Sequence, residues 1–142
     1  MSWFKPSAPF EILQAEHQVS VGGRRESGIT SAHVFKIVAK QSSEKLQFND
    51  LWIDSAYYKI SPYKQNADLS FSQTWEKGDT IFIRTSKRTF PDEGKTIKDF
   101  NGENKPLPMP YEGAALIGYK YKGKQRYHIV NQITQLPKEY HP

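Results

Sequence analysis

The sequence contains no cysteine, which excludes disulfide bonds, a thiol nucleophile and a thiolate zinc site. It also lacks any run of about 20 apolar residues, the length that a membrane-spanning helix requires. The first residues, Met1 to Pro6, contain no apolar core of the kind that a secretory signal has. The absence of cysteine leaves the compartment open, because a domain of 142 residues buries enough surface to fold without cross-links.

Sequence motifs of catalysis and metal binding are absent as well. No serine lies in a Gly-x-Ser-x-Gly or Ser-x-x-Lys pattern, and none of the four histidines has the spacing of a metal-binding helix. A zinc site needs three or four converging donors, so His17 and His33 are expected to be hydrogen-bonded structural residues. Asp50 and Asp54 form the one notable carboxylate pair and are expected to shape turns. We therefore expect no enzymatic activity, no metal and no cofactor.

What the sequence does contain is a series of short segments in which apolar and polar residues alternate between turn residues. This pattern is typical of half-buried strands and predicts an all-β fold with seven or eight strands and little helix. We expect an antiparallel two-sheet sandwich of immunoglobulin-like or Greek-key type. Residues 16–142 form its single domain, and residues 1–15 are a tail or a first edge segment. The expected strands lie near residues 17–21, 33–40, 46–53, 58–60, 69–71, 81–85, 114–121 and 125–133.

Residues 86–113 interrupt the alternation and include four prolines and three glycines. They are expected to form a long crossover loop, with a short helical turn near residues 96–100, or else a loop that covers a ligand. The alternation also changes phase between Phe48 and Leu51, so a bulge or turn is expected at Asn49 and Asp50. The residues expected in the core are Val19, Val21, Phe35, Ile37, Phe48, Leu51, Ile53, Phe71, Ile81, Ile83, Ile117 and Ile129.

The last two predicted strands flank Lys122-Gly123-Lys124, which has the composition of a hairpin connection. A three-residue loop places Tyr119 opposite Tyr127 and Ile117 opposite Ile129. The same register collects cations on one face and tyrosines on the other, and it predicts an anion-binding site. Its residues are Lys120, Lys122, Lys124 and Arg126, joined by Arg24 and Arg25 from the loop at residues 22–28. The alternatives are a solvated hairpin tip that resists edge-to-edge aggregation and a glycine loop that merely links two strands.

Three phrases resemble an uncharacterised family of small bacterial cell-envelope proteins, often lipoproteins. They are the glycine loop at residues 22–28, Phe48-Asn49-Asp50-Leu51-Trp52-Ile53 and Lys77-Gly78-Asp79-Thr80-Ile81. The resemblance implies an all-β fold and a place in the cell envelope or periplasm, and it brings no assigned activity. A chain made without a removed signal would instead be cytoplasmic.

The formal charge of +5 favours acidic partners weakly. The favoured interpretation is a monomeric, non-enzymatic binding or scaffold module of the envelope, whose ligand is a protein, a glycan or an anionic surface. The alternative is a β-barrel that binds single-stranded nucleic acid through the basic hairpin and exposed tyrosines. Tyr57, Tyr63 and Lys59 form a second aromatic and basic patch that is suited to stacking on bases or sugars.

Overall fold

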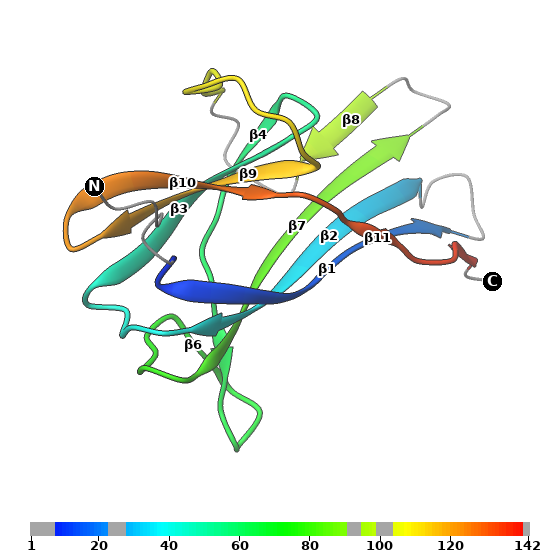
Figure 1. Cartoon of the computed structure of the whole chain (residues 1–142). Helices are drawn as coiled ribbons and strands as arrows, with labels where there is room; N and C mark the ends of the chain where they lie inside the picture. Colours follow the sequence, from blue (N-terminus) through cyan, green and yellow to red (C-terminus); the bar gives the residue numbers. More distant parts are fainter. Residues whose placement is uncertain (1–7, 23–27, 91–94, 99–103, 141–142) are drawn as a thin grey trace.

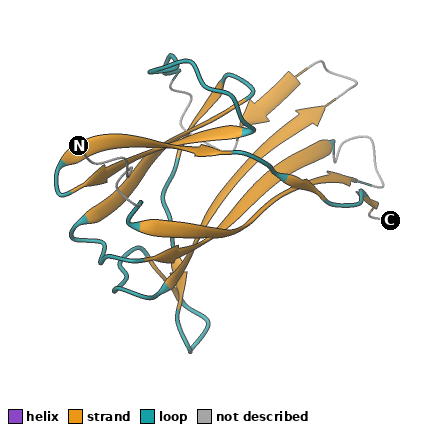
Figure 2. Ribbon diagram, viewed as in Figure 1, coloured by secondary structure: helices purple, strands orange, loops and turns teal. Residues whose placement is uncertain are grey.

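The computed structural model describes residues 8–22, 28–90, 95–98 and 104–140. Within them the secondary structure consists of strands and loops, as Figure 2 shows. Two open sheets pack face to face, which confirms the predicted all-β sandwich (Figure 1). No helix of the described part of the chain is long and apolar enough to cross a membrane.

The first sheet has the strand order β11-β1-β2-β7-β8, with β12 also paired to β1. Its long strands are β1 (Phe10–Val21), β2 (Ile29–Ala39) and β7 (Thr80–Phe90), and β8 (Lys95–Lys98) extends it. These four strands are antiparallel. The short strands β11 (Thr134–Gln135) and β12 (Glu139–Tyr140) pair with β1 in parallel, so this sheet is mixed at one edge.

The second sheet has the order β10-β9-β3-β4 and is antiparallel throughout. It contains β3 (Leu46–Ile53), β4 (Ala56–Lys59), β9 (Ala115–Tyr121) and β10 (Lys124–Val130). Asn49 is the bulge residue between Phe48 and Asp50, as predicted. A two-residue turn at Asp54 and Ser55, both with positive φ, connects β3 to β4 and matches the predicted tight turn.

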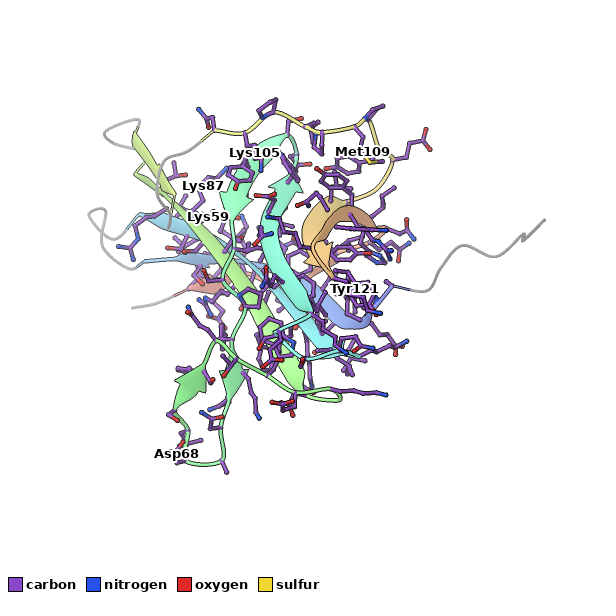
Figure 3. All side chains as sticks on the ribbon, turned by 90° about the vertical axis from the view of Figure 1, so that its left-hand side faces the viewer. Lys59, Asp68, Lys87, Lys105, Met109 and Tyr121 are labelled. Carbon is purple, nitrogen blue, oxygen red and sulfur yellow. The ribbon has the colours of Figure 1, made fainter. Side chains whose placement is uncertain are left out.

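A small hairpin, β5 (Lys64–Gln65) and β6 (Phe71–Ser72), projects from the sandwich. In Figure 3 its tip, marked by Asp68, lies at the opposite end of the molecule from Lys105 and Met109. Tyr63 joins the hairpin to the first sheet, because its backbone exchanges two hydrogen bonds with Phe82 of β7, of 2.8 and 3.0 Å.

The core between the sheets contains eight of the twelve residues predicted for it. Phe35, Ile37, Phe48, Leu51, Ile53, Ile81, Ile83 and Ile117 are buried. Val19, Val21 and Ile129 are only half-buried. The prediction for Phe71 is wrong, since this side chain is 66% exposed on the projecting hairpin, where no sheet covers it.

The segment at residues 86–113 also differs from the prediction. Residues 86–90 continue β7, and residues 95–98 form β8, so the expected helical turn is replaced by a strand as far as residue 98. Residues 99 and 100 lie outside the described residues. The described loop is thus shorter and consists of residues 104–113. At the other end of the chain, Phe10 to Ala15 of the expected tail or edge segment form the first half of β1.

Candidate functional site

An open groove lies between the projecting hairpin and the edge of the second sheet. Its wider part has a volume of about 610 Å³ and is lined by Ser61, Tyr63, Phe71 and Gln73. A narrower part of about 360 Å³ continues from it, shares Ser61 and Gln73, and reaches Asn49 at the β3 bulge. Each part falls in the size range of ligand-binding clefts.

Local structure fixes the walls of the groove. The bulge at Asn49 turns its carbonyl outward to accept a hydrogen bond of 3.1 Å from the Ile60 amide, which holds the chain after β4 against β3. Trp75 is buried at the far wall, and its indole Nε1 donates to the carbonyl of Gln41 at 3.2 Å. The narrow part of the groove is therefore anchored by a backbone contact and a buried indole, whereas the wide part takes its shape from the side chains of Tyr63 and Phe71.

The wide part of the groove ends in a corner made by two aromatic rings. Phe71 and Tyr63 meet edge to face, with centroids 5.1 Å apart and planes at 77°. Tyr63 also stacks on Phe82 at 5.7 Å and 28°. Because Phe82 occupies one face of Tyr63 and Phe71 stands at a steep angle to it, Tyr63 and Phe71 form a notch and do not make one continuous flat platform.

The narrow part of the groove combines the apolar residues Phe48, Ile60, Pro62 and Trp75 with a polar, almost uncharged lining. Gln47, Asn49 and Gln73 supply amide groups, and Ser43, Ser61 and Thr74 supply hydroxyl groups. Lys59 is the charged residue of this lining. Such side chains donate and accept hydrogen bonds without a requirement for ligand charge. The groove suits an uncharged, extended ligand with an apolar ring or side chain in the notch.

The predicted aromatic and basic patch is thus only partly present here. Tyr63 and Lys59 line the groove, whereas Tyr57 is buried outside it in a cluster with Trp52 and Leu116, and its hydroxyl donates to Asp50 at 2.6 Å. The alternation of Phe71 with Ser70 and Ser72 predicts a core position, but its side chain is exposed and lines the groove. Its position on a two-residue strand could not be inferred from that pattern.

The basic hairpin has a different register from the predicted one. The turn contains two residues, Lys122 and Gly123, with φ values of 51° and 80°, so Lys120 pairs with Gln125 and Arg126 pairs with Tyr119. The shift by one residue sends Arg126 to the face opposite that of Lys120. The prediction that these cations share one face, away from the tyrosines, is therefore wrong.

Arg126 instead lies over the ring of Tyr121 at 5.4 Å, and the Nζ atom of Lys122 approaches the same ring at 5.2 Å. These cation–π contacts give the two cations a structural role at the end of the hairpin. Arg24 and Arg25 lie outside the described residues. Lys120 lies on one face of the sheet, and Lys124 and Arg126 lie on the other. Anion binding by this hairpin stays a prediction.

The histidines form a structural pair in the first sheet. His17 and His33 lie opposite each other on β1 and β2, and their rings stack at 4.3 Å. The Nδ1 atom of His17 lies 2.6 Å from Oε1 of Gln135, and its Nε2 atom lies 2.6 Å from the Ser31 hydroxyl. The amide oxygen can only accept, so Nδ1 donates to it, and both ring nitrogens have partners, as expected for a hydrogen-bonded structural histidine.

The pKa of His33 is lowered from 6.5 to about 4, chiefly by burial and next by the neighbouring His17; Lys87 acts in the same direction and Asp54 in the opposite one. His33 is therefore neutral at pH 7. Among the described residues, no three His, Asp or Glu side chains gather in a way that could hold a metal ion.

Asp50 has a role that the sequence did not reveal. It lies in β3 and is buried, although it was expected to shape a turn. Its two carboxylate oxygens accept hydrogen bonds from the Tyr57 hydroxyl at 2.6 Å and from Lys105 Nζ at 3.1 Å. Lys105 belongs to the loop at residues 104–113, which crosses the outer face of the second sheet. The carboxylate thus ties this loop, which we call the strap, to the sheet.

Beneath the strap lies a second apolar cluster. Trp52, Tyr57 and Leu116 are buried there, with Tyr111 and Ile129 packed against them. The indole Nε1 of Trp52 donates to the carbonyl of Lys105 at 2.9 Å. Gly113 ends the strap where a Cβ atom would meet Cγ2 of Ile129 at 2.6 Å, so no larger residue fits without a shift. The second sheet is therefore buried on both faces around Trp52 and Leu116.

Comparison of the chain with protein-family models, curated proteins and solved structures finds no match. The function is accordingly inferred from the geometry of this molecule.

Proposed function

We propose that this protein is a non-enzymatic binding module whose groove holds an extended, proline-containing polypeptide segment. The observation that carries the proposal is the notch formed by Tyr63 and Phe71 at 77°, bordered by amide and hydroxyl groups. Proline-rich segments dock in aromatic-lined grooves, where a ring fills the aromatic site and the free carbonyls accept hydrogen bonds. Gln73 and Ser61 lie in the wall as donors for those carbonyls.

The geometry favours a polypeptide over the other ligands considered. A glycan or a single-stranded nucleic acid would stack on several open ring faces, and one face of Tyr63 is covered by Phe82, which leaves Phe71 as the one largely exposed ring of the lining. The nucleic-acid alternative also assumed a closed barrel and a single basic face, whereas the two sheets follow open strand orders and the hairpin cations are divided between faces. The cell-envelope location and an immunoglobulin-like topology stay predictions.

The test is a titration of the ¹⁵N-labelled protein with a decaproline peptide, followed by amide chemical shifts. We expect shifts at Ser61, Tyr63, Phe71 and Gln73, and their loss in Phe71→Ser, whose melting temperature stays unchanged because the ring is largely exposed. The matched control is Leu13→Ser, which removes an exposed leucine far from the groove in the chain. Shifts that persist in Phe71→Ser would refute the proposal, as would a response to cellohexaose in place of the peptide.

A further inference from the structure

The strap carries the longest continuous stretch of exposed apolar side chains in the described residues. Residues 106–110 read Pro-Leu-Pro-Met-Pro, and all five are exposed. Leu107 is 39% exposed and Met109 is 37% exposed. Runs of this kind are avoided on soluble surfaces unless they contact something. We call residues 106–110 the proline ridge.

The ridge is held in place before any partner arrives. Lys105 precedes it and is fixed by the indole of Trp52 and the carboxylate of Asp50, at 2.9 and 3.1 Å. Tyr111 follows it and packs on the apolar cluster under the strap. Each proline in addition fixes its own φ near −65°. Little conformational entropy would therefore be lost when the ridge binds, which favours its use in recognition.

The ridge is an exposed, proline-containing segment of the kind proposed to bind the groove, but it cannot enter the groove of its own chain. The strap lies at one end of the molecule and the projecting hairpin at the other, as Lys105, Met109 and Asp68 mark in Figure 3. The ridge stays anchored by Lys105 and Tyr111. A contact between the ridge and the groove must therefore join two molecules.

The charges near the two surfaces are complementary. Lys105 precedes the ridge and Glu112 follows Tyr111 at its other end. Asp68 lies at the tip of the hairpin that carries Phe71, and Lys59 lines the narrow part of the groove. Hydrogen bonds from Ser70 lower the pKa of Asp68, so it is ionised at neutral pH. The Lys105 side chain is 53% exposed, so it can keep its contact with Asp50 and still face Asp68 of a second molecule. With Glu112 facing Lys59 at the other end, the charges give one favoured direction for the docked ridge.

We propose that the groove of one molecule binds the proline ridge of a second copy, so that the protein assembles head to tail. This inference rests on the proposed function of the groove. The two surfaces are different, so the contact is heterologous, and each added molecule leaves a free ridge at one end and a free groove at the other. Open chains, or rings where the rotation between neighbours closes, are the result, in place of the monomer expected from the sequence.

The test is sedimentation velocity of the full chain over a concentration series, at about 0.15 M ionic strength to screen the net charge. We expect the weight-average mass to rise with concentration for the parent and for Leu13→Ser. It should stay at the monomer value for a groove variant, Phe71→Ser, and for a ridge variant, Leu107→Ser/Met109→Ser. Both variants alter exposed side chains, and unchanged melting temperatures show that each remains folded.

Mixing the two variants provides the decisive experiment. The groove variant retains a ridge and the ridge variant retains a groove, so the mixture should form a heterodimer and nothing larger. Association that persists in either variant alone would refute head-to-tail docking. A parent that stays monomeric at every concentration, while decaproline still shifts the groove amides, would refute this inference and leave the proposed function intact. If the groove binds neither decaproline nor the ridge of a second copy, both the proposed function and this inference are refuted.

Discussion

The attachment of the strap through Asp50 yields a prediction whose magnitudes follow from the structure. Tyr57→Phe removes one hydroxyl donor, Lys105→Met removes one cation, and Asp50→Ala removes the acceptor of both. The Asp50 side chain is only 6% exposed, whereas that of Lys105 is 53% exposed. The two contacts of the same carboxylate therefore lie in different surroundings, and their contributions to the free energy of unfolding should differ.

The hydrogen bond from Tyr57 is buried and charge-assisted, so its loss should cost about 1.5–3 kcal/mol. The contact with Lys105 is half in solvent, where water and salt weaken it, and it should contribute about 1 kcal/mol or less. Asp50→Ala leaves the Tyr57 hydroxyl buried without this acceptor and also frees the strap. We expect it to cost about 2–4 kcal/mol, more than either single contact.

Urea unfolding followed by tryptophan fluorescence measures these differences, because Trp52 lies under the strap. The control is Lys120→Met, an exposed lysine on the same face of the same sheet, which should change stability by no more than about 0.5 kcal/mol. A cost for Lys105→Met equal to that for Tyr57→Phe would show that burial does not rank the two contacts. A negligible effect of Asp50→Ala would refute the anchoring role altogether.

Three further predictions concern stability. Ile37→Ala, at a fully buried site between the sheets, should cost about 2–5 kcal/mol in denaturant unfolding, and an unchanged midpoint would refute its place in the core. Leu69→Gly should raise the melting temperature. Leu69 has a φ of 68°, which costs a residue with a side chain roughly 1–2 kcal/mol, and the greater entropy of glycine in the unfolded chain offsets part of the gain. Lower stability would contradict this. The pKa of His33 is 6.5 in the unfolded chain and about 4 in the folded chain. As the pH falls from 6.5 toward 4, the unfolded chain binds a proton at this residue and the folded chain does not, so the free energy of unfolding decreases over this range. His33→Gln should reduce that loss by about 1–2 kcal/mol after allowance for partial exposure, and parallel pH profiles would refute it.

Features set by neighbouring residues could be predicted from the sequence. The bulge at Asn49 followed from a change of phase within six residues, and the turn at Asp54 and Ser55 followed from the preference of both residue types for turns. The inner faces of β2 and β7 followed from strict alternation, which gave Phe35, Ile37, Ile81 and Ile83 correctly. In each case the information lay within one strand or one turn.

Features set by distant segments could not be predicted in this way. Trp52 and Leu116 have the parity of outward-facing residues, and only the strap, more than 50 residues from Trp52 in the chain, buries them. The signal available was the uninterrupted apolar run Leu51-Trp52-Ile53, which is typical of strands buried on both faces. The basic hairpin was misassigned because Lys122 adopts positive φ, which shortened the turn by one residue.

The two surfaces proposed to meet are also where the chain departs from local rules of sequence. Three-residue hairpin loops such as that at residues 67–69 ordinarily place glycine at the last position, where φ is positive, yet Leu69 occupies it and is 72% exposed. At the other end of the molecule, five apolar residues in succession are exposed along the strap. Neither feature contributes to the core, and each has an unfavourable free energy in an isolated molecule. Sequences tend to retain such departures where a partner compensates for them. One departure lies beside the aromatic notch at one end of the molecule, and the other lies on the rigid proline ridge at the other end. Head-to-tail docking explains why both occur.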